Sequence, residues 1–117
     1  VSLSLLYRFK SKNDMKTIEI SVNEYFTKKY SDDLDARFRK LNQEVLELNE
    51  AFENYQGAID PSDRKRKYEH LKDELGDVQT VLTHICTILG VSQEELLINS
   101  IVKSKVREVL PNYMKGE

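Results

Sequence analysis

The stretch from Asp33 to Gly57, DLDARFRKLNQEVLELNEAFENYQG, decides the fold class of this chain. Its large apolar side chains recur at alternating steps of four and three residues: Leu34, Phe38, Leu41, Val45, Leu48, Phe52 and Tyr55. This spacing keeps one face of an α-helix apolar along its whole length, as in helices that pack lengthwise at a shallow angle. Asp32 or Asp33 can cap the start, and Gly57 can end the helix, so we expect one helix to about Tyr55.

The next stretch, from Asp60 to Gly90, has the same periodicity. It opens with DPSD, in which proline is tolerated in the first turn and acidic groups are favoured. Its seam follows steps of three and four: Tyr68, Leu71, Leu75, Val78, Leu82, Ile85 and Leu89. Val81, Cys86 and Ile88 widen the apolar arc in the second half. That arc is wider than a small bundle needs, and we expect the surplus at a subunit interface.

Two capping-box sequences predict the remaining helices. SVNE at 21–24 predicts a short helix over 22–29, with a small strand at 17–20 as the alternative. SQEE at 92–95 predicts a last helix that Pro111 stops. Four helices with short connections predict an all-α fold, arranged as an antiparallel four-helix bundle.

Length and composition exclude several classes of protein. The 117 residues suffice for one domain, and 18 basic against 20 acidic side chains give a net charge of −2. That balance argues against a nucleic-acid polymer as the main partner. Cys86 cannot form an internal disulfide, and with His70 and His84 it makes too few ligands for structural zinc.

The N-terminal stretch has a different character from the rest. VSLSLLYRF at 1–9 is apolar but too short to span a bilayer, and its charges follow it, unlike those of a signal peptide. We therefore expect residues 1–14 to be an extension outside a single domain at 15–117. We also expect no membrane partner and a cytoplasmic location.

Four carboxylates accompany the two seams. Glu44, Glu47, Glu74 and Asp77 each stand one residue before a seam position, about 100° round the helix. If the two long helices face each other, the two pairs converge, and their repulsion costs free energy unless cations neutralise it. Oxygen-only ligands suit Mg²⁺, with Mn²⁺ as a possible substitute. The alternative is a solvated acidic face, which is common in a chain with 20 acids.

The same residues carry a resemblance. KLNQEVLELNEA at 40–51, followed by DELGDV at 73–78, resembles the signature of MazG-like enzymes, which is ExxE on one helix and ExxD on the next. These are all-α nucleoside triphosphate pyrophosphohydrolases, and the resemblance extends from about Ile20 to Arg107. It implies hydrolysis of a nucleoside triphosphate to monophosphate and pyrophosphate, in clearance of non-standard or surplus nucleotides. It also implies Mg²⁺ held by Glu44, Glu47, Glu74 and Asp77.

The chain departs from the family pattern at one position. Many members carry a further Glu where this chain has Gln43, which bears on the metal count and on the identity of the water-activating base. A carboxylate that is not fully used as a metal ligand can take a proton from the attacking water, and Glu44 and Glu47 are the two candidates for this catalytic role.

Phosphate charge also requires cations near the site. Candidate substrate-binding residues lie in the last helix: Asn99, Lys103, Lys105 and Arg107. Lys103 and Arg107 are four residues apart on one face, and similar enzymes keep Asn, Lys and Arg in this segment. The alternative is that these cations only favour the helix C-terminus electrostatically.

The sequence therefore predicts a Mg²⁺-dependent nucleoside triphosphate pyrophosphohydrolase that assembles as a homodimer or a dimer of dimers. Two alternatives stay open. One is a non-catalytic helical dimerisation or regulatory module, in which the acids are simply solvated. The other is a related pyrophosphohydrolase that acts on phosphoribosyl-ATP.

Overall fold

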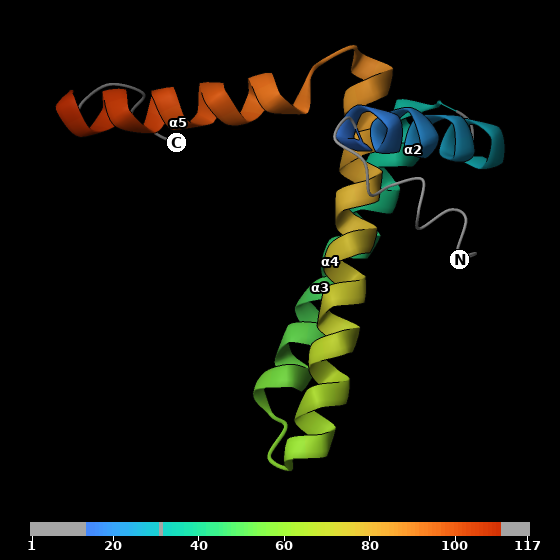
Figure 1. Ribbon diagram of the computed structural model, residues 1–117, viewed down its shortest axis with the longest axis vertical. Coiled ribbons are helices and arrows are strands. Elements are labelled where there is room, and N and C mark those ends of the chain that lie inside the picture. Colours follow the sequence, from blue (N-terminus) through green and yellow to red (C-terminus); the bar gives the residue numbers. More distant parts are fainter. Residues whose placement is uncertain (1–13, 31, 111–117) are drawn as a thin grey trace.

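The computed structural model describes residues 14–30 and 32–110, and within them every regular element is an α-helix. The predicted all-α class is therefore confirmed. Figure 1 shows the helices in chain order: α2 (Asp14–Tyr30), α3 (Leu34–Gln56), α4 (Pro61–Leu89) and α5 (Gln93–Val109).

The ends of α3, α4 and α5 follow the capping residues found in the sequence. Asp33, Asp60 and Ser92 each accept a hydrogen bond from a backbone N–H in the first turn of the helix that follows. Gly57 ends α3, and Gly90 ends α4 with φ 71°, in the left-handed region that favours glycine. Local capping chemistry is enough to set these boundaries.

The prediction for the first helix was wrong at its start. α2 begins at Asp14, so Ser21 lies inside the helix, and residues 17–20 are helical, not a strand. The capping-box spacing competes here with good helix formers such as Met15, Lys16 and Glu19, and with the packing of α2 across α4. The predicted extension at 1–14 lies, except for Asp14, outside the described residues.

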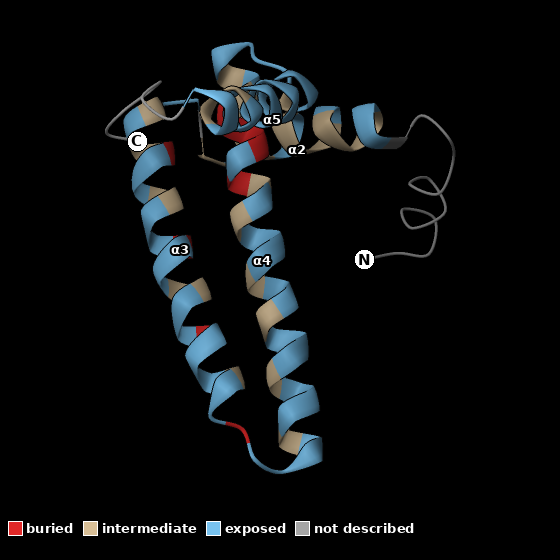
Figure 2. Cartoon of the chain, turned by 90° about the vertical axis from the view of Figure 1, so that its left-hand side faces the viewer, coloured by how far each residue is buried: buried red, intermediate tan, exposed pale blue. Residues whose placement is uncertain are grey.

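α3 and α4 lie side by side and antiparallel, forming a long helical hairpin (Figures 1 and 2). α2 crosses the end of α4, where the Thr27 hydroxyl lies 3.0 Å from Nε2 of the fully buried His84 and the Phe26 ring packs on the imidazole. α5 turns away from α4 by 98° and packs along none of the other described helices (Figure 1). The four helices of the described chain therefore do not form the antiparallel four-helix bundle expected from the sequence.

The buried residues gather where α2 crosses α4 (Figure 2). Val81, His84 and Ile85 are buried there, while farther down the hairpin α3 buries Glu44 and Ala51. The apolar core formed by the described residues is therefore small for their number.

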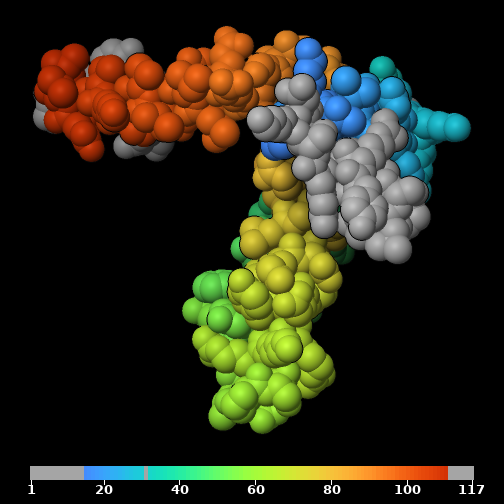
Figure 3. Space-filling view, in the orientation of Figure 1, coloured from blue at the N-terminus to red at the C-terminus, as the bar shows by residue number. Residues whose placement is uncertain are grey.

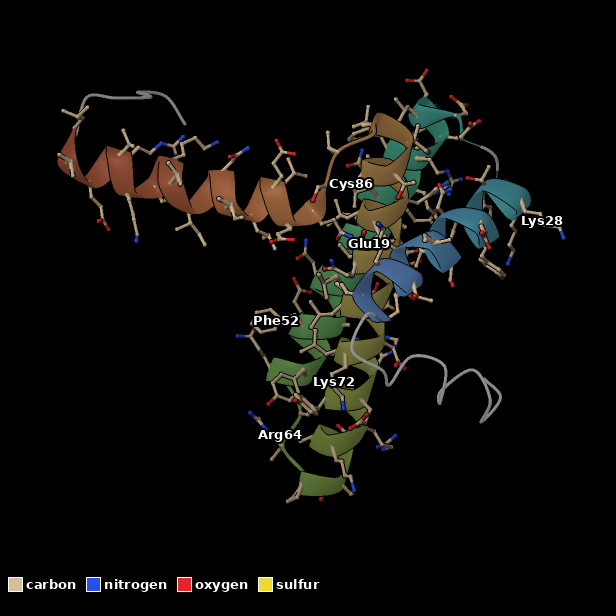
Figure 4. The ribbon with its side chains drawn as sticks, turned by 45° about the horizontal axis from the view of Figure 1, so that its top comes forward. Glu19, Lys28, Phe52, Arg64, Lys72 and Cys86 are labelled. Atoms are coloured by element: carbon tan, nitrogen blue, oxygen red, sulfur yellow. The ribbon has the colours of Figure 1, made fainter. Side chains whose placement is uncertain are left out.

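The face that α3 turns toward α4 differs from the expected seam. Phe38, Val45 and Phe52 are 47%, 37% and 47% exposed, whereas Arg37, Glu44 and Ala51, each one residue earlier, are buried. Figure 4 shows Phe52 on the outer side of the hairpin. The other seam residues of α3, Leu34, Leu41, Leu48 and Tyr55, stay half-buried. α3 is therefore turned by less than one residue position, so the row of Arg37, Glu44 and Ala51 lies toward α4 and half of the predicted seam lies outside.

α4 shows the same shift. Tyr68, Leu75, Leu82 and Leu89, spaced seven residues apart, are all exposed. Ile85 of the same predicted seam is buried, as are Val81 and His84 in the neighbouring row. Half of the predicted seam of α4 therefore faces inward. Among the described residues, no single helix is long and apolar enough to cross a membrane. Only α4 and α5 taken together, across their 98° bend, pass that test of length and composition.

Candidate metal centre between α3 and α4

Three carboxylates from two helices meet near the middle of the hairpin. Glu44 comes from α3, and Glu74 and Asp77 come from α4, with one oxygen of each lying within 4.8 Å of the others. Glu74 and Asp77 are three residues apart, so they share one side of α4. Glu44 reaches them because its row, and not the Val45 row, faces α4.

The cluster contains oxygen atoms that lack a partner. The Glu44 side chain is 7% exposed and that of Glu74 is 13% exposed. Oε2 of both residues is buried without a hydrogen-bond donor. A buried carboxylate oxygen without a partner costs free energy, which a bound cation would recover. The donor set, oxygen only and anionic, fits a hard divalent cation such as Mg²⁺.

A lysine and a histidine contact the edges of the cluster. Nζ of Lys40 lies 2.9 Å from Glu44 Oε1, one helical turn away on α3. Nε2 of His70 lies 3.7 Å from Glu74 Oε1 on α4. The hydrogen bond to Glu44 raises the pKa of Lys40, so this lysine stays charged. Both contacts are to Oε1, which leaves each Oε2 free of these two side chains.

The carboxylates perturb one another. Burial, and then the charge of Asp77 and Glu47, raise the pKa of Glu74 above its usual range. Partial desolvation, followed by the charge of Glu44, raises the pKa of Asp77. The cluster is therefore under electrostatic repulsion when all of its members are ionised.

Glu47 stands beside the cluster and outside the group of three. It is half-buried, and its charge contributes to the raised pKa of Glu74. Of the four predicted metal ligands, the structure thus brings Glu44, Glu74 and Asp77 together and leaves Glu47 as a neighbour.

The predicted substrate-binding residues lie far from this cluster in the same chain. Asn99, Lys103 and Lys105 are exposed on α5, and Arg107 is half-buried on it. Figure 3 shows that α5 stands clear of the hairpin. At about 1.5 Å per residue along each helix, Lys103 and Asp77 are separated by roughly 25 Å.

Lys40 is the cluster residue that the sequence pattern did not single out. Its signal was a Lys four residues before Glu44, a spacing that places the two side chains on one helix face. Such pairs are common on solvated helices. This pair lies at the cluster because Glu44, and not Val45, faces α4.

Comparison of the sequence with protein-family models found no matching family, and comparisons with curated proteins and with solved structures found no match. The functional argument therefore depends on the residues and their geometry.

Proposed function

We propose that this chain is a Mg²⁺-dependent nucleoside triphosphate pyrophosphohydrolase of the MazG-like type, acting in clearance of non-standard or surplus nucleotides. The observation that carries the proposal is the convergence of Glu44, Glu74 and Asp77 across two helices, with two buried oxygens that have no partner. The ExxE and ExxD motifs of the sequence supply all of these residues.

In this proposal Glu44, Glu74 and Asp77 hold the cation. Mg²⁺, when bound, supplies neutralisation of phosphate charge and increases the acidity of a nearby water molecule. Glu44 Oε1 contacts Lys40, and its Oε2, which is buried without a partner, would be the oxygen available to a cation. Lys40 thereby orients Glu44.

Glu47 is the proton acceptor that the geometry favours over Glu44. It lies next to the cluster without being one of the three converging ligands, so its carboxylate keeps a free lone pair. It would take a proton from the water that attacks the α-phosphorus, and pyrophosphate would leave as the α–β phosphoanhydride bond breaks.

Cations are also needed for the β- and γ-phosphates, because phosphoryl transfer depends on charge neutralisation and positioning. We assign this role to Lys103, Lys105 and Arg107, and we assign Asn99 to substrate binding as a neutral hydrogen-bonding residue. The proposed enzyme is a homodimer or a dimer of dimers, in which the helical bundle is completed between chains.

A second candidate function is a helical dimerisation module without turnover. The observation that favours it is the Lys40–Glu44 ion pair of 2.9 Å, which partly neutralises the cluster without metal. This candidate predicts that Mg²⁺ does not change the stability of the protein.

The test is turnover of a panel of canonical and modified NTPs and dNTPs, with pyrophosphate and orthophosphate measured separately. We expect Mg²⁺-dependent pyrophosphate release, and a loss of at least about a hundredfold in Glu74→Gln and Glu47→Gln. Mg²⁺ at a hundred times its dissociation constant should also stabilise the wild-type and Glu47→Gln proteins by about 2.7 kcal/mol.

Glu53→Gln is the matched control, because Glu53 is an exposed acid on α3, the helix of Glu47, and lies outside the cluster. It should keep wild-type turnover. Release of orthophosphate alone would mean that a different bond is cut. A folded protein with no turnover and no stabilisation by Mg²⁺ would support the non-catalytic module.

A further inference from the structure

The closed end of the hairpin, where α3 turns into α4, carries a pocket that the proposed reaction does not use. The pocket is open to solvent and has a volume of about 360 Å³. Five residues line it: Tyr55, Pro61, Arg64, Lys65 and Tyr68. Small-molecule sites begin at about this volume and combine apolar walls with a few polar groups. The lining has that composition, because two rings and a proline stand beside two cations and no acid.

The aromatic walls of the pocket come from both helices of the hairpin. Tyr55 lies in the last turn of α3 and Tyr68 in the second turn of α4, with ring centroids 5.9 Å apart and ring planes at 47°. Tyr68 is exposed and Tyr55 is half-buried. Neither helix supplies both rings, so the pocket depends on the closed hairpin. Rings that reach the surface in this way offer stacking faces to a flat ligand.

Arg64 is held against one of these rings. Its guanidinium carbon lies 4.6 Å from the centroid of the Tyr55 ring, and its Nη2 donates to the Tyr55 hydroxyl at 3.2 Å. Figure 4 shows Arg64 near the closed end of the hairpin. A guanidinium has five N–H donors, and this bond uses one of them. Because the ring already restricts the side chain, less rotamer freedom is lost when the other donors bind an anion.

The acids next to the pocket in the sequence are engaged by other groups. Asp63 pairs with Arg66 at 2.6 Å and with Lys67 at 3.8 Å. Asp60 accepts a hydrogen bond from the Ser62 hydroxyl at 2.6 Å and a second one from the backbone N–H of Asp63 at 3.4 Å. These acids are therefore taken up by the first turns of α4 and not by the cations of the pocket.

Arg64 and Lys65 keep charges that no described acid neutralises. Neither residue forms an ion pair with another described residue. Both side-chain types bind phosphate, Arg through its planar fork and Lys as a point charge. Aromatic rings beside such cations are the combination with which proteins hold a base and its phosphate.

We propose that this pocket, the tip pocket, binds a nucleoside monophosphate. The base stacks against the rings of Tyr55 and Tyr68, and the phosphate accepts hydrogen bonds from Arg64 and Lys65. A ligand that has both a flat ring and a phosphate engages all four side chains at once. Inorganic phosphate or a nucleoside alone engages only two of them.

The tip pocket is a separate site from the carboxylate cluster. Arg64 is ten residues before Glu74, which is about 15 Å along α4. A phosphate bound to Arg64 therefore does not reach a cation held by the carboxylates. The inference stands without the proposed function. If that function also holds, the tip pocket binds the class of molecule that the reaction releases.

A single nucleotide fits the tip pocket better than a nucleic-acid strand does. A strand requires a continuous row of cations for its successive phosphates. Arg66 and Lys67, the next cations along the chain, are already paired with Asp63, and the whole chain has a net charge of −2. The basic stretch at 64–67 thus offers two available cations, at one pocket.

Isothermal titration calorimetry of the full chain with AMP, in the presence of a chelator, tests the proposal. The chelator removes divalent cations, so the charge of the carboxylate cluster opposes phosphate binding there. We expect AMP to bind, and adenosine and inorganic phosphate each to bind at least about tenfold more weakly. Phosphate that binds as tightly as AMP would overturn the role of the rings. Adenosine that binds as tightly as AMP would overturn the role of the cations.

Two nearby arginines provide a matched pair of variants. Arg64→Gln should weaken AMP binding at least about tenfold, because a charged hydrogen bond is lost. Tyr68→Leu should weaken it about fivefold or more through loss of stacking. Arg66→Gln removes the same charge two residues away, from a side chain that is paired with Asp63 and does not line the pocket, and should keep AMP binding within about twofold. Arg64 and Tyr68 are exposed, so circular dichroism should show unchanged helix content in all three variants.

Absence of AMP binding, or equal losses in Arg64→Gln and Arg66→Gln, would overturn the tip pocket. Single-stranded DNA that binds far more tightly than AMP would replace it with a strand-binding surface. The turnover assay is independent of these measurements. A protein that hydrolyses nucleotides without binding AMP in chelator would refute this inference alone, and an inactive protein that binds AMP would refute the proposed function alone.

Discussion

Glu74 illustrates how one residue can oppose folding for the sake of a site. Its side chain is almost buried, its Oε2 has no partner, and its neighbours raise its pKa. In the unfolded chain this carboxyl ionises at its ordinary pKa. A carboxyl with a raised pKa in the folded state stabilises the fold below its ordinary pKa and loses that contribution as the pH rises through the raised value.

The change Glu74→Gln should therefore stabilise the metal-free protein at neutral pH, because an amide removes the repulsion among the carboxylates. The advantage over wild type should shrink as the pH falls toward the ordinary pKa of a carboxyl group, because Glu74 then becomes protonated in the folded and in the unfolded chain alike. Thermal unfolding in the presence of a chelator, compared between about pH 4 and pH 7, measures this difference.

Glu53→Gln is again the control, since Glu53 is exposed and outside the cluster. A Glu74→Gln protein that is less stable than wild type at neutral pH, with no divalent cation present, would contradict the prediction. That result would mean that Glu74 is held by a favourable contact.

At the scale of the elements, the hairpin depends on which rows of α3 and α4 meet. Ala51 is 1% exposed and Val81 is 3% exposed, so small or compact side chains allow the helices to approach. Glu44 lies on the same side of α3 as Ala51, and Asp77 lies on the same side of α4 as Val81. The helix faces that pack the hairpin together therefore also bring the carboxylates together.

Gly76 lies on a side of α4 that no other part of the described chain covers. A Cβ added at this position meets nothing within 4 Å. The sequence motif had suggested a close helix approach or room for a ligand, and no other part of the described chain comes close. Gly76→Ala should therefore stabilise the protein by about 0.5–1 kcal/mol, since alanine loses less backbone entropy in a helix.

Chemical denaturation of the two proteins measures the difference. Gly90→Ala provides the contrast, because its φ of 71° should make that change cost about 1–2 kcal/mol. If Gly76→Ala were destabilising, a second chain or a ligand would have to lie against that face of α4.

At the scale of the whole molecule, buried residues gather at the α2–α4 crossing (Figure 2), and apolar side chains are exposed along the hairpin and along α5. Among the described residues, the buried apolar side chains are few: Val81 and Ile85 at this crossing, Ala51 farther down the hairpin and Ala58 in the connection between α3 and α4. Such a core contributes little hydrophobic free energy for a chain of this length. Stability should therefore depend on association.

The thermal midpoint should rise with protein concentration, because association stabilises the folded state by mass action. Leu82→Glu should lower the midpoint and shift the protein toward monomer, since it places a charge in the exposed row of α4. Thermal scans over a hundredfold range of concentration, with sedimentation velocity, measure both effects. A midpoint that is independent of concentration in a monodisperse monomer would refute the dependence on association.

Much of the secondary structure was determined by the sequence alone. The starts of α3, α4 and α5 depend on Asp33, Asp60 and Ser92, whose side chains bond backbone groups only two or three residues away. The acid pairs follow from the same local geometry, since residues three apart share a helix face. The start of α2 was missed because the SVNE sequence resembles a cap but lies in a helix that packs across α4.

Only the tertiary structure decided which row of α3 faces α4 and where α5 points. The Glu44 and Val45 rows are neighbours, and the choice between them depends on what the partner helix offers, which periodicity does not contain. The direction of α5 depends on Gln93 bonding to Glu19, 74 residues away in the sequence. Contacts this distant determine the site, because they bring three carboxylates together and hold the proposed cationic residues away from them in the same chain.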